Sequence, residues 1–259
     1  MNKVAGKTLL ITRPPDQAAA DAAFFKPYGL HTVIASTLRY EDCKADLPAA
    51  GDIDALIVTS ARGVDTGLND LGAYRDKAIY CVGEQSADAA RAAGFACVYA
   101  AAGTADDLID LICTHEQSGA NVLYLRGRDV SKDMKPAMEN RGYVVQSRIV
   151  YSALEVEEPA KDVLDRLARH DIDAVGFYSK RSAGIFVKWI KAYGLEGSLS
   201  ATKALCISDA VLECVRVLPW QDCSVSKMPD GNAMRRLCLT ALGCVAGGQW
   251  PPIVNKQYF

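Results

Sequence analysis

Hydroxyl and basic side chains follow two short apolar segments, at the point where a strand would give way to a helix. Ser60 comes directly after one segment and precedes Arg62, and Ser179 comes after another and precedes Arg181. Serine at this position is a good helix N-cap, and the free N–H groups of a first helical turn bind anions. The two turns therefore predict either plain helix caps or a pair of sites for an anionic ligand.

Another turn has a glycine at the corresponding position. Gly83 precedes Gln85 and Ser86, and a glycine there would let the backbone approach a ligand closely. Its counterpart at Ser208 lacks that glycine.

Arg126, Gly127 and Arg128 end a further apolar segment and place two guanidiniums around a glycine. Guanidinium forks suit carboxylate or phosphate, although two solvated surface arginines would give the same pattern. Because basic residues gather at strand ends in a chain of net charge −2, we expect a small polyanion held between two similar domains. The candidate binding residues are Arg13, Ser60, Ala61, Arg62, Gly83, Gln85, Ser86, Arg126, Gly127, Arg128, Ser179, Lys180 and Ser208.

Tyr151 is the candidate for acid chemistry. It ends an extended stretch over residues 144–151, and an unperturbed phenol, with a pKa of about 10, stays protonated at neutral pH. Such a group could donate a hydrogen bond or a proton to a ligand. The alternative is an ordinary strand tyrosine.

Several classes of protein are excluded by missing motifs. The chain contains no GxGxxG, no GxxxxGK[ST] and no GxSxG, which argues against a dinucleotide site, a P-loop and a hydrolase elbow. The net charge of −2 argues against a broad nucleic-acid-binding surface. No run of 18 apolar residues occurs, and the apolar run near the N-terminus is too short for a signal peptide.

Cysteine and histidine usage predicts neither disulfides nor a metal site. The nine cysteines are odd in number, form no CxxC and lie mostly in apolar stretches, which predicts buried, reduced thiols in a cytoplasmic protein. His31, His115 and His170 are far apart in the sequence, and none belongs to an HExxH or HxH pair.

The elements that must position these residues alternate between strand and helix patterns. With 259 residues, the chain is long enough for about two domains. The predicted strands are 7–12, 54–59, 78–82, 96–99, 121–125, 173–178, 203–207 and 223–226, and the predicted helices are 85–93, 105–115, 160–169, 181–192 and 231–242. This alternation predicts α/β domains whose parallel sheets carry helices on both faces, with ligands bound beyond the carboxyl ends of the strands.

An internal repeat divides the chain into two similar units. Residues 52–64 align without gaps on residues 171–183, with identity at six of thirteen positions. Upstream, residues 9–13 match residues 122–126, and each unit then runs through an extended stretch to a tyrosine, Tyr40 or Tyr151. One α/β unit is therefore present twice.

The repeat alone leaves two layouts open. The units could be tandem domains, roughly 1–118 and 119–259. Alternatively, the extended stretches near 33–41 and 144–153 could be two crossing linkers, so that both ends of the chain share one domain.

The order and spacing of seven motifs over residues 7–246 resemble the uroporphyrinogen-III synthase family. The motifs are Leu10-Ile11-Thr12-Arg13-Pro14, the segment 54–60, the segment 80–87, the segment 123–128, Val150-Tyr151, Phe177-Tyr178-Ser179 and Cys206-Ile207-Ser208. The resemblance implies two similar flavodoxin-like domains joined by a two-stranded linker. Domain 1 would comprise 1–35 and 152–259, domain 2 would comprise 39–148, the linker strands would be 36–38 and 149–151, and residues 247–259 would form a flexible tail.

The resemblance also implies a reaction. The expected substrate is hydroxymethylbilane, a linear tetrapyrrole with eight carboxylates, which would fit the anion-binding turns. The expected enzyme is a cofactor-free, metal-free lyase of haem biosynthesis that removes the ring-A hydroxyl, closes the macrocycle through a spiro intermediate and inverts ring D. The family's catalytic tyrosine falls on Tyr151.

The remaining expectations concern partners and alternatives. We expect a cytoplasmic monomer that binds neither nucleic acid nor membrane and makes at most a transient contact with the preceding pathway enzyme. The alternatives are a non-catalytic polyanion-binding or sensory module of the same fold, and an α/β enzyme acting on another small polyanion such as a sugar phosphate.

Overall fold

The chain folds into two compact units, each with its own sheet. The computed structural model describes residues 6–65, 68–102, 104–130 and 133–244, so the expected tail at 247–259 lies outside the described residues. Unit 1 draws on Met1–Arg39 and Glu155–Phe259, and unit 2 is Tyr40–Leu154. The chain passes from one unit to the other within β3 (Leu38–Asp42) and again at the end of β8 (Val144–Glu155).

The sheet of unit 1 is parallel and has five strands. Their order is β11 (Asp222–Val225), β10 (Lys203–Cys206), β9 (Ala174–Phe177), β1 (Thr8–Ile11) and β2 (His31–Ile34). Numbered along unit 1 alone, this is the flavodoxin-like order 2-1-3-4-5. In that order the side on which successive strands are added reverses between β1 and β9, and ligands of such sheets bind at this switch point, beyond the carboxyl ends of the strands.

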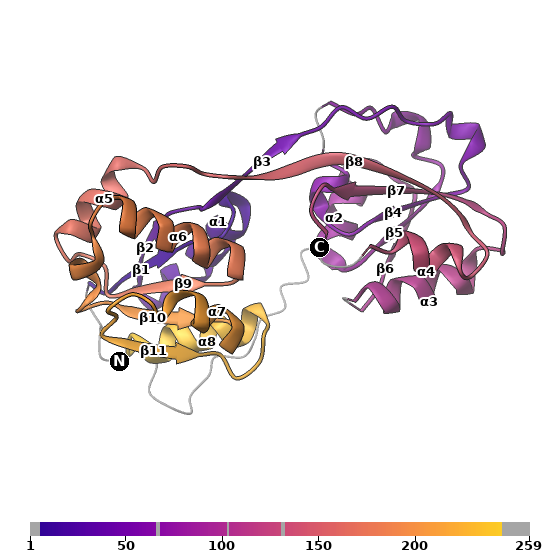
Figure 1. The fold of residues 1–259 in the computed structure, drawn as a ribbon. Coiled ribbons are helices and arrows are strands. Elements are labelled where there is room, and N and C mark those ends of the chain that lie inside the picture. The colour runs from indigo at the N-terminus through magenta and orange to yellow at the C-terminus, as the bar shows by residue number, and fades with distance from the viewer. Residues whose placement is uncertain (1–5, 66–67, 103, 131–132, 245–259) are drawn as a thin grey trace. The chain divides into compact units, whose positions relative to one another are not determined.

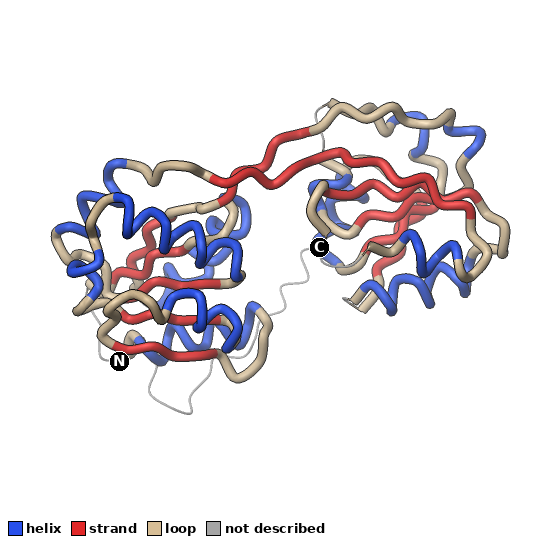
Figure 2. Tube along the Cα trace, in the orientation of Figure 1, coloured by secondary structure: helices blue, strands red, loops and turns tan. Residues whose placement is uncertain are grey.

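Helices cover both faces of this sheet (Figures 1 and 2). On one face, α1 (Pro15–Phe25) and α8 (Gly231–Ala241) contribute buried residues such as Phe25 and Met234 to a core with β1. On the other, α5 (Lys161–Ala168), α6 (Lys180–Ala192) and α7 (Asp209–Val215) pack around Phe177 and Phe186. Two 3₁₀ turns, Lys26–Tyr28 and Glu196–Leu199, complete the unit.

The sheet of unit 2 has six strands. Their order is β3, β8, β7 (Asn121–Gly127), β4 (Ala55–Val58), β5 (Ala78–Cys81) and β6 (Cys97–Ala100). Pairing is parallel from β8 through β6. The first strand differs, since Cys43 N–H donates to Val150 C=O and Val156 N–H donates to Thr37 C=O, as in an antiparallel pair.

The helices of unit 2 also lie on both faces of its sheet. On one face, α2 (Glu84–Ala92) and the 3₁₀ turns Ala50–Asp52, Ala61–Gly63 and Gly72–Tyr74 lie over a core that includes Leu125. On the other face, α3 (Ala105–His115) and α4 (Lys135–Glu139) pack against Tyr80 and Tyr124. None of the helices in the described part of the chain is long and apolar enough to cross a membrane.

The sequence repeat is a repeat of topology. The segment matching β1 is β7, and the segment matching β9 is β4. β1 lies beside β9 in the sheet of unit 1, and β7 lies beside β4 in the sheet of unit 2. Apart from the edge strand β3, the matching strands of unit 2 therefore have the same spatial order as those of unit 1, with the switch point between β7 and β4. The predicted α/β class with parallel sheets is confirmed.

All eight predicted strands and all five predicted helices are present, with ends that differ by at most two residues. The interpretation that the cysteines are buried is wrong for most of them. All nine are free, but only Cys81, Cys206 and Cys238 are buried, while Cys97 and Cys113 are exposed. Cys97 lies on β6, an edge strand, and Cys113 lies on the outer side of α3, so apolar neighbours in the sequence do not bury them.

Candidate functional site

Tyr151 lies at the switch point of unit 2 because of a β-bulge in β8. Arg126 of β7 pairs with Ile149, but the next residue, Gly127, pairs with Tyr151, so β8 has one extra residue. Neighbouring residues of a regular strand point to opposite faces. The bulge instead lets both Val150 and Tyr151 pack against the same core, and it directs the phenol towards the turns that follow β4 and β7.

Gly127 is required for this placement. A Cβ at position 127 would lie 2.7 Å from Cε2 of Tyr151 and 3.0 Å from its hydroxyl oxygen. The aromatic ring therefore lies directly against the backbone of Gly127, and any side chain there would displace it. Gly127 was predicted to bind a ligand, and in the structure it holds the tyrosine.

The surroundings of the phenol keep it protonated. Burial raises the pKa of Tyr151 above its ordinary value, and hydrogen bonds from Ser60 and the Gly127 backbone, together with the nearby Arg62 charge, offset part of that rise. The groups that would stabilise a phenolate are thus already in place around a neutral phenol. This is the arrangement of a proton donor.

Ser60 and Arg62 are held by their own turn and by an aromatic ring. The Ser60 hydroxyl accepts a hydrogen bond from the Arg62 N–H at 3.3 Å and caps a single 3₁₀ turn rather than a longer helix. The guanidinium of Arg62 lies 4.8 Å from the centre of the Tyr40 ring, and Tyr40 packs edge-on against Tyr151 at 5.8 Å. Cation–π contacts of this kind fix a guanidinium in place.

Tyr40 was absent from the predicted site. The repeat contained a signal for it, because Tyr40 and Tyr151 end the two matching extended stretches. The structure brings these equivalent tyrosines together, since β3 and β8 are neighbours in one sheet.

The other predicted residues of unit 2 lie in two places. Gly83 is the N-cap of α2 with an extended backbone, and a Cβ there would meet nothing within 4 Å. The fold of unit 2 thus does not require a glycine at this position. Gln85 is exposed and Ser86 is buried.

Arg126 is bound to its own surroundings. Its Nε donates to the Ser147 hydroxyl at 2.9 Å, and its Nη1 donates to the carbonyls of Gly127 and Arg128 at 3.1 and 3.2 Å. These bonds brace the turn that carries Gly127. Arg128 itself is exposed, and its backbone N–H donates to Tyr151 C=O.

In unit 1, Arg13 follows β1 at the switch point. Its Nη1 donates to Asp21 Oδ2 at 2.9 Å, its Nη2 donates to Gln17 at 2.8 Å, and its guanidinium lies 4.4 Å from the Tyr178 ring centre. Asp21 is fully buried and also accepts from Nε of Arg235 at 2.8 Å. The sequence did not indicate Asp21 or Arg235.

The remaining predicted residues of unit 1 follow β9 and β10. Ser179 caps α6 by accepting from the Ser182 N–H at 3.1 Å, and Lys180 is exposed. Ser208 is the N-cap residue of α7, but its side chain makes no capping hydrogen bond. Among the residues that the structure describes, no cluster of three metal-ligating side chains occurs.

The structure thus gathers Tyr151, Ser60, Ala61, Arg62 and Gly127 at one switch point and Arg13 and Ser179 at the other. Two doubly wound α/β units with the same strand order, each with polar turns at its switch point, define a two-domain α/β protein built by duplication.

Comparison with known proteins identifies the family. The model of the uroporphyrinogen-III synthase family (HemD) matches residues 19–235, and the chain belongs to that family. Uroporphyrinogen-III synthase activity in haem biosynthesis is therefore the function that family membership indicates, and the comparisons give no support to a non-catalytic module.

Solved structures of this family are similar to the chain. Uroporphyrinogen-III synthetase from Helicobacter pylori has 15% identity and a TM-score of 0.61, and the match covers 90% of this chain and 99% of the other. A mutant uroporphyrinogen III synthase from Thermus thermophilus has 17% identity and a TM-score of 0.49, with 92% and 99% covered. The similarity to the Helicobacter pylori structure supports the two-domain α/β fold.

Proposed function

We propose that Tyr151 is the acid of a cofactor-free cyclising lyase that converts hydroxymethylbilane into uroporphyrinogen III. The observation that carries the proposal is the position of the Tyr151 phenol at the switch point of unit 2. Burial there raises its pKa, and the Ser60 side chain, the Gly127 backbone and the Arg62 charge would stabilise the phenolate. An acid in this state can give up a proton at the moment of reaction and regain it afterwards.

The proton and electron balance of the reaction is closed within the substrate and Tyr151. The ring-A hydroxyl takes the phenolic proton and leaves as water with the electrons of the C–O bond, while the ring-A pyrrole stabilises the resulting cation. The substituted carbon of ring D attacks this centre to form the spiro intermediate. The bond from this ring-D carbon to the methylene that joins it to ring C then breaks, and the electrons of that bond return to ring D. The resulting ring-C cation is attacked by the unsubstituted α-carbon of ring D, which inverts the ring, and the proton lost from that carbon returns to Tyr151.

The donors around Tyr151 would lower the barrier to proton transfer. Ser60, the Gly127 backbone and the Arg62 charge all favour the phenolate, and they do so in fixed positions. Preorganised donors of this kind act where negative charge develops and need no reorganisation.

The polar turns would bind the substrate's carboxylates. In unit 2 these are Arg62, Gly83, Gln85, Ser86 and Arg128 with the backbone of Ala61, and in unit 1 they are Arg13, Ser179, Lys180 and Ser208. Arg126 would act by bracing the turn that carries Gly127. Holding a flexible substrate in a reactive fold can supply much of the rate enhancement.

Two further proposals concern the cell. The nine free thiols suit a reducing compartment, and we place the protein in the cytoplasm. The net charge of −2 favours no nucleic-acid partner, and because the substrate also closes spontaneously to the type I isomer, a transient contact with the enzyme that produces it would be advantageous.

The test is an isomer-resolved assay. Hydroxymethylbilane is supplied to the purified protein, and the type I and type III products are separated by chromatography. We expect the type III isomer to dominate and its yield to scale with protein concentration. Formation of the type I isomer alone at high protein concentration would contradict the proposed function.

A further inference from the structure

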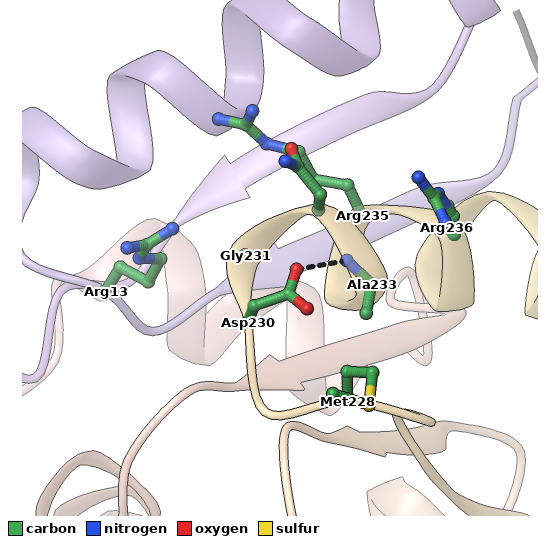
Figure 3. A pocket seen from close by; sticks show the side chains of 8 residues that line it. Arg13, Met228, Asp230, Gly231, Ala233, Arg235 and Arg236 are labelled. Carbon is green, nitrogen blue, oxygen red and sulfur yellow. Dashed lines mark hydrogen bonds between the residues drawn. The ribbon is translucent and has the colours of Figure 1, made fainter. Parts of the chain in front are cut away.

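The equivalent arginines near the ends of β1 and β7 bind different partners in the two units. In unit 1, Arg13 donates to the buried Asp21 of α1, and together with Arg235 it lines an open pocket of about 540 Å³ (Figure 3). In unit 2, Arg126 donates from Nε to the hydroxyl of Ser147, at 2.9 Å on the neighbouring strand β8. The same residue of the repeated unit therefore binds a helix in one copy and a strand in the other.

Unit 2 has an apolar residue at the position of the carboxylate that binds Arg13. The sequence offset that relates Arg13 to Arg126 leads from Asp21 to Met134, which is fully buried. A methionine thioether is a weak acceptor and carries no charge to pair with a guanidinium. The partner that holds Arg13 in unit 1 is thus replaced, and Arg126 is held by other acceptors.

Unit 2 also has a hydroxyl where unit 1 has an apolar side chain. Ser147 of β8 pairs with Tyr124 of β7, and the matching pair in unit 1 is Ile34 of β2 with Ile11 of β1. The side chain of Ile34 offers no hydrogen-bond acceptor, whereas a serine hydroxyl accepts readily. The Ser147 hydroxyl is therefore the feature of unit 2 that draws Arg126 towards β8.

Held in this direction, Arg126 fixes the turn against which Tyr151 lies. Its Nη1 donates to the carbonyls of Gly127 and Arg128 at 3.1 and 3.2 Å. Gly127 pairs with Tyr151 across the bulge, and the Arg128 N–H donates to the Tyr151 carbonyl at 2.9 Å. Both residues whose carbonyls Arg126 binds are thus in direct contact with Tyr151, and hydrogen bonds from a charged donor are stronger than neutral ones.

Ser147 and Arg126 act from the face of the sheet opposite to the phenol. Neighbouring residues of a strand alternate between faces, so Arg126 lies on the face of Tyr124 and Ser147 lies on the face of Val145, both of which pack with α3 and α4. Tyr151 packs against the core on the other face. Ser147 therefore acts on Tyr151 through Arg126 and the backbone of the turn.

We propose that Ser147 is a positioning residue for Tyr151, an inference that rests on the proposed role of Tyr151 as the acid. By accepting from Arg126, Ser147 directs the guanidinium to the carbonyls of the turn. The turn in turn holds the phenol beside Ser60 and Arg62, which favour the phenolate. A small displacement of a proton donor slows the chemical step more than it weakens substrate binding, so the effect of Ser147 should fall on kcat.

The first experiment removes the acceptor and then restores it. Ser147→Ala should lower kcat for type III formation about 3- to 10-fold with little change in KM, because substrate binding is left intact. Ser147→Thr keeps the hydroxyl and should recover most of the rate. The matched control is Ser118→Ala, at an exposed serine of the same unit. A kcat of Ser147→Ala equal to that of Ser118→Ala would overturn the proposal, and so would an equal loss in Ser147→Thr.

The second experiment asks whether Ser147 acts through Arg126. Arg126→Met should lower kcat at least as much as Ser147→Ala does. The double variant should be no slower than Arg126→Met alone, because Ser147 then has no guanidinium left to direct. Losses that multiply in the double variant would show that Ser147 acts separately and would contradict the proposal.

A titration of the phenol tests its placement without any substrate. The absorbance of phenolate is followed with pH in the protein and in Tyr151→Phe, and the difference between the two isolates Tyr151. Burial is the largest cause of the raised pKa of Tyr151, so a phenol that leaves its place should titrate at lower pH. We expect this shift when Ser147→Ala is compared with its own Tyr151→Phe double variant, and no shift in Ser118→Ala. An unchanged titration in Ser147→Ala would overturn the positioning role.

The titration also separates this inference from the proposed function. Absence of type III product from the unmodified protein would refute the proposed function itself. A shifted titration in Ser147→Ala would in that case still show that Ser147 positions the phenol.

Discussion

The switch points of the two units have the same origin in sequence and different contents. Arg13 and Arg126 are repeat equivalents, as are Ser179 and Ser60. In unit 2 the arginine braces a turn under a protonated phenol, whereas in unit 1 it shares the buried Asp21 with Arg235 and lines a pocket. The comparison shows that one duplicated scaffold has two different switch points, with a buried phenol in one copy and a buried carboxylate shared by two arginines in the other.

The largest expected effect on stability falls on the buried carboxylate of unit 1. Asp21→Asn leaves two guanidiniums without their counterion and should cost about 2 to 4 kcal/mol of unfolding free energy. The value lies below that of a fully buried pair because the side chains of Arg13 and Arg235 are 21% and 25% exposed. The shift of the urea midpoint measures it, with Asp16→Asn, exposed on the same helix, as the control. Equal midpoints for the two variants would show that Asp21 is no anchor.

The corresponding change in unit 2 should affect catalysis first. Gly127→Ala places a Cβ at 2.7 Å from the Tyr151 ring and must displace it, so we expect kcat to fall about 10- to 100-fold. The overpacking should also cost about 1 to 3 kcal/mol of stability. The control is Gly51→Ala in the same unit, where a Cβ meets no atom within 4 Å. A Gly127→Ala enzyme with the kcat of this control would exclude the ring placement described here.

Substitution of Tyr40 should lower kcat less than substitution of Gly127. Tyr40→Leu removes the edge-on contact with Tyr151 and the surface under Arg62, each worth about 0.5 to 1.5 kcal/mol, so a fall of about 3- to 10-fold in kcat is expected. Tyr40→Phe keeps both ring contacts and should retain more of the rate. If the two variants are equally slow, the ring contacts are not what positions the acid.

Alkaline pH should weaken both units through equivalent buried thiols. Burial raises the pKa of Cys81 in β5 and of Cys206 in β10 from 9.0 to about 12. Below pH 9 both thiols are protonated in the folded and unfolded chains, so this contribution to stability is complete. Between pH 9 and about 12 the unfolded chain loses protons that the folded chain retains, so stability falls. Urea midpoints across this range should fall less steeply for Cys81→Ala and Cys206→Ala, and an unchanged slope would contradict the assignment.

Much of the fold follows from the sequence because buried parallel strands are short apolar runs. The first and last positions of β2, His31 and Ile34, are exposed at the sheet edge, and this strand was recognised only as part of an extended stretch. The helix α1 was not predicted, although Pro14 and Pro15 mark its start. The helix buries Asp21, whose carboxylate is paired with Arg235, 214 residues away in the sequence. The residues near Asp21 in the sequence do not indicate this pairing.

The site was predicted to the extent that strand ends reveal it. Ser60 and Arg62 follow from their positions after a strand, and Tyr151 follows from its position at the end of an extended stretch; the structure brings them together. The β-bulge that directs Tyr151 depends on pairing with β7, and a single sequence does not show which residue of β8 is the extra one. The guanidinium of Arg126 was expected to face a ligand, but backbone carbonyls at its own turn bind it.

The division of roles between the units depends most directly on Tyr151. The decisive measurement is the rate of type III formation by Tyr151→Phe, compared with Tyr193→Phe, an exposed tyrosine of unit 1. If Tyr151 supplies the proton, its variant should lose about 10²- to 10⁴-fold in kcat while still binding substrate, and the spontaneous type I isomer should accumulate instead. A Tyr151→Phe enzyme that forms the type III isomer at the rate of Tyr193→Phe would contradict the account.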